Sequence, residues 1–496
     1  MKRFTVALLA AALLLSGCST GTSRPVESVA ADLQSFYGQS VDWHTCDSTF
    51  ECASIEAPLD WASPQQSSIQ LSLIRHRATG QSEGSLLVNP GGPGGSGVGF
   101  IRDSLDYAVS PTLQQHYDIV GFDPRGVGSS SAVSCLDAAE MDSYLYDILP
   151  GTRGSADWIA EATASEQAFA DACSENTGEL LQFVDTQSAA RDLDLIRAVL
   201  GDPKLNYLGY SYGTYLGANY AELYPERVGR MVLDGALDPA ASNIDVNVAQ
   251  AQGFEQQLRA YLTDCLAGTD CPFAGQSVDQ AMQTIRKVLE QLDVTPLTSA
   301  DGRKLGADAL LTAIVYPLYS DRAWPRLSQM FAALQQGDAS LAFELADGYN
   351  GRNPDGTFLD NSTEAFSAIN CLDYEYDASP QAMAADRARL EAAAPVIGTY
   401  FAYGDIGCAV WPYQTHHVRG PIAAAGSAPI VVVGTTGDPA TPYQWAVNLS
   451  EQLENATLIT YQGNGHTAYN KSNACVNDAV DAYFVSGTVP AAGLTC

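Results

Sequence analysis

Six short apolar runs, bounded by Gly, Pro or Asp, alternate with helical patterns along this chain of 496 residues. Unbroken apolar strands separated by helices are typical of a parallel sheet that is buried on both faces. The pattern therefore predicts an α/β fold, with a mostly parallel sheet flanked by helices. The predicted strands cover residues 85–89, 117–122, 205–209, 228–233, 429–434 and 457–461.

The spacing of these runs is uneven. A long stretch rich in Ala, Leu and Gln separates the fourth run from the fifth, and it favours helices, for example over 249–266 and 278–292. We therefore predict one sheet interrupted by a large helical lid insertion. The predicted units are a first part of the core at 43–240, the lid insertion at 241–404 and a C-terminal part of the core at 405–496.

The third predicted strand runs directly into Gly209-Tyr210-Ser211-Tyr212-Gly213, a G-x-S-x-G motif followed by a helical pattern. A sharp strand-to-helix turn exposes the serine oxygen, and the flanking glycines leave room where side chains would clash. The following helix N-terminus favours negative charge nearby. This context predicts Ser211 as a nucleophile rather than part of a purely structural turn.

A serine nucleophile needs a base and a carboxylate that orients the base. In α/β-hydrolases, whose nucleophile occupies such a turn, the chain order is Ser, acid, His. Of the six histidines, His466 follows the last apolar run among glycines, whereas we expect His416 and His417 to be lid or interface residues. Asp438 follows the fifth run, at a strand end where α/β sheets bind ligands. Asp234 and Asp238 are the rival acids.

A glycine-rich loop, Asn89-Pro90-Gly91-Gly92-Pro93-Gly94-Gly95, follows the first predicted strand. Acyl-transfer chemistry needs preorganised N–H donors for the oxyanion, and this loop has the place of the oxyanion loop in such enzymes. We predict Gly92 and Tyr212 as the donors. A phosphate-binding loop is the alternative, but no Gly-Lys-Ser/Thr follows. Chemistry of this kind calls for no metal or organic cofactor.

The charge balance excludes one class of partner. The chain has 25 Lys and Arg against 57 Asp and Glu, a formal charge of −32. Nucleic-acid binding requires a basic surface that neutralises phosphates, so we expect no nucleic-acid partner.

The N-terminus has the features of an export signal. Lys2 and Arg3 precede an apolar run over 6–15, which is too short to span a membrane. Leu15-Ser16-Gly17-Cys18 also resembles a bacterial lipobox, in which the chain is cut just before the cysteine and the cysteine sulfur carries a diacylglycerol. We therefore expect a signal peptide at 1–17 and a lipid-anchored tether at 18–42. The expected location is the outer side of a bacterial cell envelope, or the medium if Cys18 is unmodified.

The cysteine count is 11, and lipidation of Cys18 leaves an even ten. Exported proteins meet an oxidising compartment, so we expect disulfides. Connectivity does not follow from sequence alone. Neighbours along the chain indicate the pairs Cys46–Cys52, Cys135–Cys173, Cys265–Cys271, Cys371–Cys408 and Cys475–Cys496.

Together these segments resemble the α/β-hydrolase serine exopeptidases related to proline iminopeptidase and the secreted tripeptidyl aminopeptidases of actinomycetes. The resemblance rests on five segments. They are the glycine loop at 89–95, Gly121-Phe122-Asp123-Pro124-Arg125-Gly126-Val127-Gly128, the G-x-S-x-G turn at 209–213, Gly437-Asp438-Pro439 and Gly465-His466. Proline iminopeptidases have His where this chain has Pro90, and this difference looks like the tripeptidyl branch.

The resemblance implies an exopeptidase that holds the free N-terminus of a peptide in its lid. An ammonium group in a cleft calls for a carboxylate, and Asp373 and Glu375 in the insertion are the candidates. We expect Arg125 to support the loop of Asp123. A carboxylesterase or lipase on the same fold and an inactive envelope-anchored binding protein are the competing functions. The sequence makes no prediction of oligomeric state.

Overall fold

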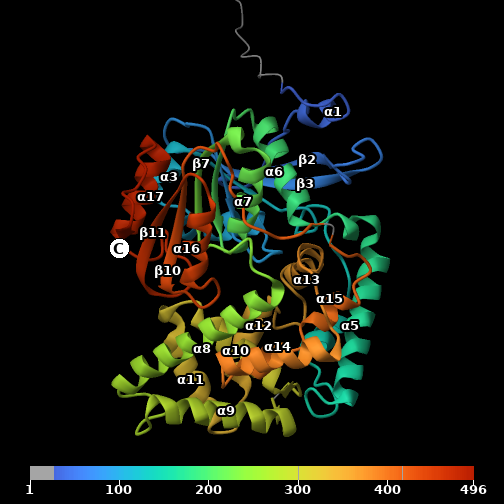
Figure 1. Cartoon of the computed structure of the whole chain (residues 1–496), viewed down its shortest axis with the longest axis vertical. Helices are drawn as coiled ribbons and strands as arrows, with labels where there is room; N and C mark the ends of the chain where they lie inside the picture. The colour runs from blue at the N-terminus through green and yellow to red at the C-terminus, as the bar shows by residue number, and fades with distance from the viewer. Residues whose placement is uncertain (1–26, 300, 416) are drawn as a thin grey trace, which may run out of the picture.

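A computed structural model of the chain describes residues 27–299, 301–415 and 417–496. The predicted signal peptide, Cys18 and the first part of the tether lie outside the described residues, as does His416. Figure 1 shows one half of the molecule built around a sheet and the other half built of helices. None of the helices in the described ranges combines the length and apolarity that a membrane span requires.

The sheet has ten strands in the order β1-β2-β3-β5-β4-β6-β7-β10-β11-β12. The first three pairs in this order, β1–β2, β2–β3 and β3–β5, are antiparallel. Every later pair, from β5–β4 to β11–β12, is parallel. All six predicted strands are present. The strands are β1 (His44–Asp47), β2 (Phe50–Pro58), β3 (Ser68–His76), β4 (Ser85–Asn89), β5 (Asp118–Phe122), β6 (Leu205–Tyr210), β7 (Val228–Asp234), β10 (Ile430–Gly437), β11 (Ala456–Asn464) and β12 (Leu494–Thr495).

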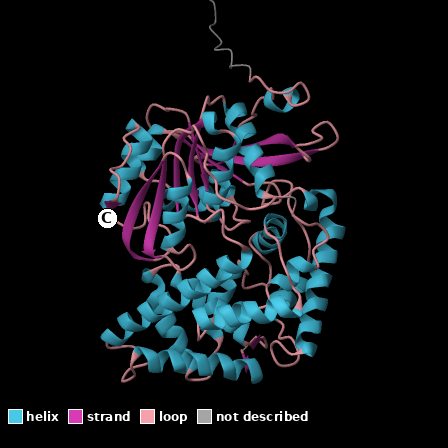
Figure 2. Ribbon diagram, viewed as in Figure 1, coloured by secondary structure: helices cyan, strands magenta, loops and turns pink. Residues whose placement is uncertain are grey.

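Helices cover both faces of this sheet (Figure 2). Successive strand residues point to opposite faces, so Val431 packs with one helical layer and Val432 with the other. The first layer contains α2 (Gly97–Ala108), α3 (Pro111–His116) and α17 (Ala474–Ser486), and the second contains α6 (Thr186–Leu200), α7 (Tyr212–Leu223) and α16 (Tyr443–Gln452). A short helix, α1 (Gln34–Tyr37), packs at the edge of the second layer. Burial on both faces explains why the central strands read as continuous apolar runs.

A helical insertion lies between β7 and β10, and its helices extend past the boundary predicted at residue 404. Its helices are α8 (Asn243–Ala267), α9 (Val278–Val294), α10 (Ala307–Leu318), α11 (Trp324–Leu334), α12 (Ser340–Asn350), α13 (Ser362–Asp373), α14 (Pro380–Ala393) and α15 (Asp405–Ala409), with a small hairpin of β8 (Leu297–Thr298) and β9 (Lys304–Leu305). It has an apolar core of its own, which includes Leu258, Ile285 and Ile314.

A second segment joins this helical half. The helices α4 (Ala138–Tyr146) and α5 (Ala156–Thr177) follow β5, inside the range assigned above to the first part of the core. Tyr146 is part of the apolar core of the insertion, and Trp158 packs with Met383 and Ile406. Figure 1 shows α5 alongside α13 and α15. We call α4, α5 and α8–α15 together the cap.

All five predicted disulfides are present: Cys46–Cys52, Cys135–Cys173, Cys265–Cys271, Cys371–Cys408 and Cys475–Cys496. Cys46–Cys52 lies at the edge of the sheet, Cys265–Cys271 at the end of α8 and Cys475–Cys496 at the C-terminus. The Cys371–Cys408 bond instead joins α13 to α15 across the cap.

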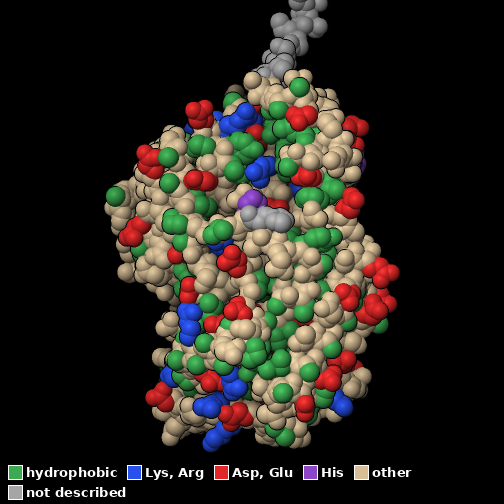
Figure 3. Space-filling view, turned by 45° about the vertical axis from the view of Figure 1, so that its right-hand side comes forward, with side chains coloured by type: hydrophobic (Ala, Val, Ile, Leu, Met, Phe, Trp, Pro, Cys, Tyr) green, Lys and Arg blue, Asp and Glu red, His purple; other side chains and the backbone are tan. Residues whose placement is uncertain are grey.

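Acidic side chains outnumber basic ones in this chain, and the surface reflects that excess (Figure 3). The face drawn in Figure 3 carries acidic groups over much of its described surface, and a group of Lys and Arg side chains lies at the lower end, over the cap. This distribution agrees with the formal charge of −32.

Candidate active site

Ser211 lies at the turn between β6 and α7 with φ 55° and ψ −125°. A non-glycine residue adopts this conformation only where the surroundings enforce it, and such residues cluster at functional sites. A Cβ on Gly209 would lie 2.4 Å from the carbonyl oxygen of Gly213, and a Cβ on Gly213 would lie 2.7 Å from Asn89 Oδ1. The G-x-S-x-G spacing is therefore required by close packing around the serine.

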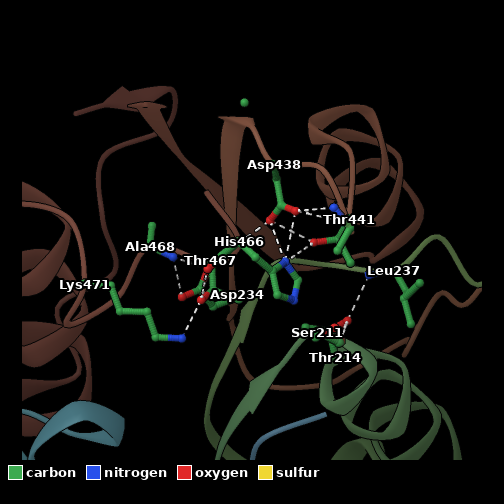
Figure 4. Close-up of polar contacts among 12 residues, drawn as sticks. Ser211, Thr214, Asp234, Leu237, Asp438, Thr441, His466, Thr467, Ala468 and Lys471 are labelled. Atoms are coloured by element: carbon green, nitrogen blue, oxygen red, sulfur yellow. Dashed lines mark hydrogen bonds and ion pairs between the residues drawn. The ribbon is translucent and has the colours of Figure 1, made fainter. Parts of the chain in front are cut away.

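His466 and Asp438 meet beside this turn. Nδ1 of His466 lies 2.9 Å from both carboxylate oxygens of Asp438, and Figure 4 shows the imidazole between Asp438 and Ser211. The N–H groups of Ala440 and Thr441 donate to Asp438 Oδ1, and Thr441 Oγ1 donates to Oδ2 at 2.9 Å. A carboxylate held in this way fixes the orientation and tautomer of the imidazole.

The rival acids have other partners. The Asp234 carboxylate accepts the N–H groups of Ala468 and Tyr469, just after His466, and burial raises its pKa. Lys471 points toward the same carboxylate (Figure 4), and burial lowers the pKa of this lysine to about 8. Asp238 accepts from Asn448 and Gln452 on α16. Asp234 thus supports the loop of His466, whereas Asp438 is the carboxylate that contacts the imidazole of His466.

The predicted oxyanion donors lie beside the serine. A Cβ on Gly91, which has φ 99°, would lie 2.8 Å from Ser211 Cβ and 3.1 Å from the nitrogen of Tyr212. The glycine loop therefore approaches the nucleophile as closely as backbone allows. Tyr212 is the first residue of α7, where the N–H has no acceptor within the helix. Tyr212 therefore has an N–H that can donate to an oxyanion, whereas Gly92 is the next residue after Gly91 in the glycine loop and its donor role stays a prediction.

A cavity of about 270 Å³ begins at these two residues and extends between the sheet and the cap. Phe366, Asn370 and Tyr374 line it from α13 and its end, and Trp411 follows α15. The cap also reaches the catalytic histidine directly, because the carbonyl oxygen of Tyr319 accepts the N–H of His466 at 2.9 Å.

The two acids proposed for the substrate N-terminus have different surroundings. Asp373 is buried, lines the cavity and accepts from the N–H and Oγ1 of Thr186; burial raises its pKa to about 7. Thr186 Oγ1 also bonds the hydroxyl of Tyr212 at 2.5 Å, so Asp373 supports an oxyanion residue. Glu375 is exposed and lies outside the residues that line this cavity, although its neighbours Tyr374 and Tyr376 line it. The prediction for Glu375 therefore has no support in the structure.

Arg125 is buried in the core and forms two 2.7 Å hydrogen bonds with Asp192 on α6. Its remaining donors bond the carbonyl oxygens of Pro58, Leu59 and Phe183. The loop of Asp123 is held separately, by Ser96 and the N–H groups of Val98 and Ser129. Arg125 is structural, as expected, but its acidic partner is Asp192.

Sequence reasoning missed three cavity residues from the second cap segment, which are Tyr144, Glu166 and Phe169. Tyr144 and Glu166 line the cavity, and the tyrosine hydroxyl lies 3.2 and 3.3 Å from the two carboxylate oxygens. They lie far from Ser211 in the sequence, and the spacing of the predicted strands assigned their segment to the core rather than to the cap. Only the packing of α5 beside α15 brings them to the site.

Known proteins resemble the chain over nearly its whole length. It is 35% identical to a serine protease named Hip1 of Mycobacterium tuberculosis, over 99% of this chain and 96% of that protein. The tripeptidyl aminopeptidase of Streptomyces lividans is 33% identical over 92% of this chain and 86% of its own length. A family profile described as TAP-like protein matches residues 394–496. The chain belongs to the TAP-like family of α/β-hydrolases.

Membership of the TAP-like family confirms the predicted serine peptidase on the α/β-hydrolase fold. The matched residues 394–496 contain Asp438 and His466, so the family profile covers two members of the triad. A relative of M. tuberculosis named carboxylesterase B is 39% identical over 90% of this chain and 86% of that protein. The TAP-like relatives therefore carry both peptidase and esterase names.

Proposed function

We propose that this chain is an extracytoplasmic aminopeptidase that releases short peptides, in particular tripeptides, from free N-termini. The cavity that begins at Gly92 and Tyr212 carries the proposal, because it extends under the cap on the side of the oxyanion donors. A peptide whose N-terminal segment fills such a cavity places a bond near its start at Ser211. Buried carboxyl groups in the cavity favour a cationic terminus.

The chemistry follows from the triad. Ser211 Oγ attacks the peptide carbonyl while His466 Nε2 takes its proton, and Asp438 stabilises the imidazolium through Nδ1. The N–H groups of Gly92 and Tyr212 stabilise the oxyanion. His466 then protonates the leaving amine, and an acyl-enzyme forms. Water, activated by the same histidine, releases the N-terminal peptide and restores the serine.

The location outside the cytoplasm rests on the sequence of the N-terminus and is supported by the five disulfides, which form in oxidising compartments. We propose that cleavage before Cys18 and lipidation of its sulfur anchor the protein to the envelope. Mass spectrometry of the mature N-terminus tests this: the expected product begins with a diacylated Cys18, and an unmodified N-terminus beyond residue 18 would contradict it.

The activity is tested with a tripeptidyl anilide such as Ala-Pro-Ala-p-nitroanilide, its N-acetylated analogue and p-nitrophenyl butyrate. The proposal predicts that the free anilide is the best substrate and that acetylation abolishes its cleavage. Ser211→Ala should lower kcat by about 10⁴-fold or more without unfolding the protein, because only the nucleophile is removed.

A carboxylesterase is the second candidate function, and the relative named carboxylesterase B favours it. The same triad serves esters and amides. Hydrolysis of the butyrate ester together with complete inertness toward both anilides would assign the chain to esterases.

A further inference from the structure

Glu166 is a cap carboxylate that lines the cavity between the cap and the oxyanion region. It lies on α5, lines the cavity and is half-buried. A Cβ on Gly407 of α15 would lie 2.8 Å from Glu166 Oε2, so the carboxylate is packed against that helix. Only the absence of a side chain at Gly407 leaves space for it there.

The carboxylate has one polar partner in the described part of the chain, the hydroxyl of Tyr144. No Lys, Arg or His of the described ranges forms an ion pair with Glu166. Burial raises the pKa of Glu166, because the charged form lacks a compensating cation. A buried carboxylate with a single hydroxyl partner keeps free acceptor capacity.

Aromatic rings line the same cavity as this carboxylate. Tyr144 stacks on Phe169 with ring centroids 4.5 Å apart and planes at 9°, and Phe169 lies 6.2 Å from Trp411. All three rings line the cavity. Aromatic faces attract cations, and a low-dielectric wall strengthens the attraction between a cation and a carboxylate.

The other charged groups of the cavity are already engaged. Both carboxylate oxygens of Asp373 accept hydrogen bonds from Thr186. Arg419, the cavity's cation, lies over the rings of Tyr215 and Tyr374 at 3.8 and 4.1 Å and donates to the carbonyl oxygen of Asp238. Glu166 is therefore the cavity carboxylate best able to take a charged partner from the substrate.

We propose that Glu166, held by Tyr144, binds the α-ammonium group of the peptide substrate and so determines which peptide bond reaches Ser211. The inference rests on the proposed aminopeptidase function and deepens it. An ammonium group offers three donors, of which the carboxylate accepts one or two. Anchoring the terminus on α5 fixes the length of peptide between Glu166 and the acyl carbon.

The test compares Glu166→Gln with the wild type. Glutamine has the same shape and can still accept from Tyr144, but it carries no charge. The matched control is Glu161→Gln, an exposed residue on the same helix. The substrates are Ala-Pro-Ala-p-nitroanilide, its N-acetylated analogue and p-nitrophenyl acetate. The rate of labelling by a fluorophosphonate reports the integrity of the triad.

Glu166→Gln should lower kcat/KM for the free anilide by about 10- to 100-fold, mainly through KM, because a charge-assisted hydrogen bond in a buried site is lost. Hydrolysis of the acetate ester and fluorophosphonate labelling should stay within about twofold of wild type, since neither involves an ammonium group. Glu161→Gln should match the wild type on every substrate. Tyr144→Phe, which keeps the carboxylate, should give a smaller loss in the same direction.

Three results would overturn the inference. If Glu166→Gln cleaves the free anilide as well as wild type, the terminus is bound elsewhere, while the aminopeptidase function stands. If Asp373→Asn alone shows the selective loss, Asp373 is the anchor. If wild type cleaves the ester but neither anilide, the proposed function fails and this inference fails with it.

Discussion

Asp234 connects to Ser211 through the backbone: the carbonyl oxygen of Asp234 accepts the N–H of Ser211 at 2.9 Å. Its carboxylate accepts the N–H groups of Ala468 and Tyr469 on the other side of the site. One residue at the end of β7 therefore holds both the nucleophile and the loop that carries His466. The relative positions of serine and histidine depend on it.

Asp234→Asn should lower kcat by about tenfold, because an NH2 donor replaces one of the two acceptor oxygens, the charge facing Lys471 is lost and the histidine loop shifts. KM for a peptide anilide should change little. The control is Asp238→Asn, a buried acid of the following loop whose partners lie on α16. It should lose stability in urea denaturation but keep kcat. Equal kcat in the two variants would contradict the positioning role of Asp234.

Thr441 supports the acid of the triad. Its hydroxyl donates to Asp438 Oδ2 and lies 3.2 Å from His466 Nδ1. Thr441→Val keeps the shape and removes the hydrogen bond, so kcat should fall by about 5- to 10-fold. Thr441→Ser should restore most of the rate. A valine variant as active as the wild type would show that the backbone N–H groups hold Asp438 sufficiently by themselves.

Asp373 should make stability depend on pH. Its folded pKa is raised to about 7, above the unfolded value of about 3.9. The folded state therefore binds the proton more tightly, and this contribution to stability is present below pH 4 and is lost as pH rises through about 7. Asp373→Asn cannot ionise. The free energy of unfolding of wild type minus that of the variant should fall by up to about 1.4 kcal/mol per pH unit in this window. Urea denaturation at several pH values measures it, and a constant difference would contradict the shift.

The Cys371–Cys408 disulfide joins two cap helices that line the cavity. It closes a loop with a sequence separation of 37, so replacing both cysteines with alanine should cost about 4 kcal/mol of stability by the chain-entropy account. The cavity should also loosen and KM for the peptide anilide should rise. Removing Cys46–Cys52, at the sheet edge with a separation of 6, should leave KM unchanged. Similar KM values for both double variants would show that the bond does not shape the cavity.

The sequence predicted the central parallel strands, each candidate member of the triad and the glycine loop, because each of these features has its own local pattern in the chain. The strands β2 and β3 were missed because their outer faces are exposed; the alternating pattern at 50–58 mixes Glu and Ser with Ile and Ala. Glu166 could not be predicted from its surroundings in sequence. It is one acid in an Ala-rich helix, and its role depends on the packing of α5 against α15, which no local pattern encodes.

In the proposed reaction, Ser211 releases short peptides from free N-termini. The most direct test is mass spectrometry of the products that the purified protein forms from one unblocked peptide of about ten residues and from its N-acetylated form. The account predicts successive release of tripeptides from the unblocked peptide, no cleavage of the acetylated one and no products with Ser211→Ala. Internal cleavage of the acetylated peptide, or unchanged cleavage by Ser211→Ala, would contradict it.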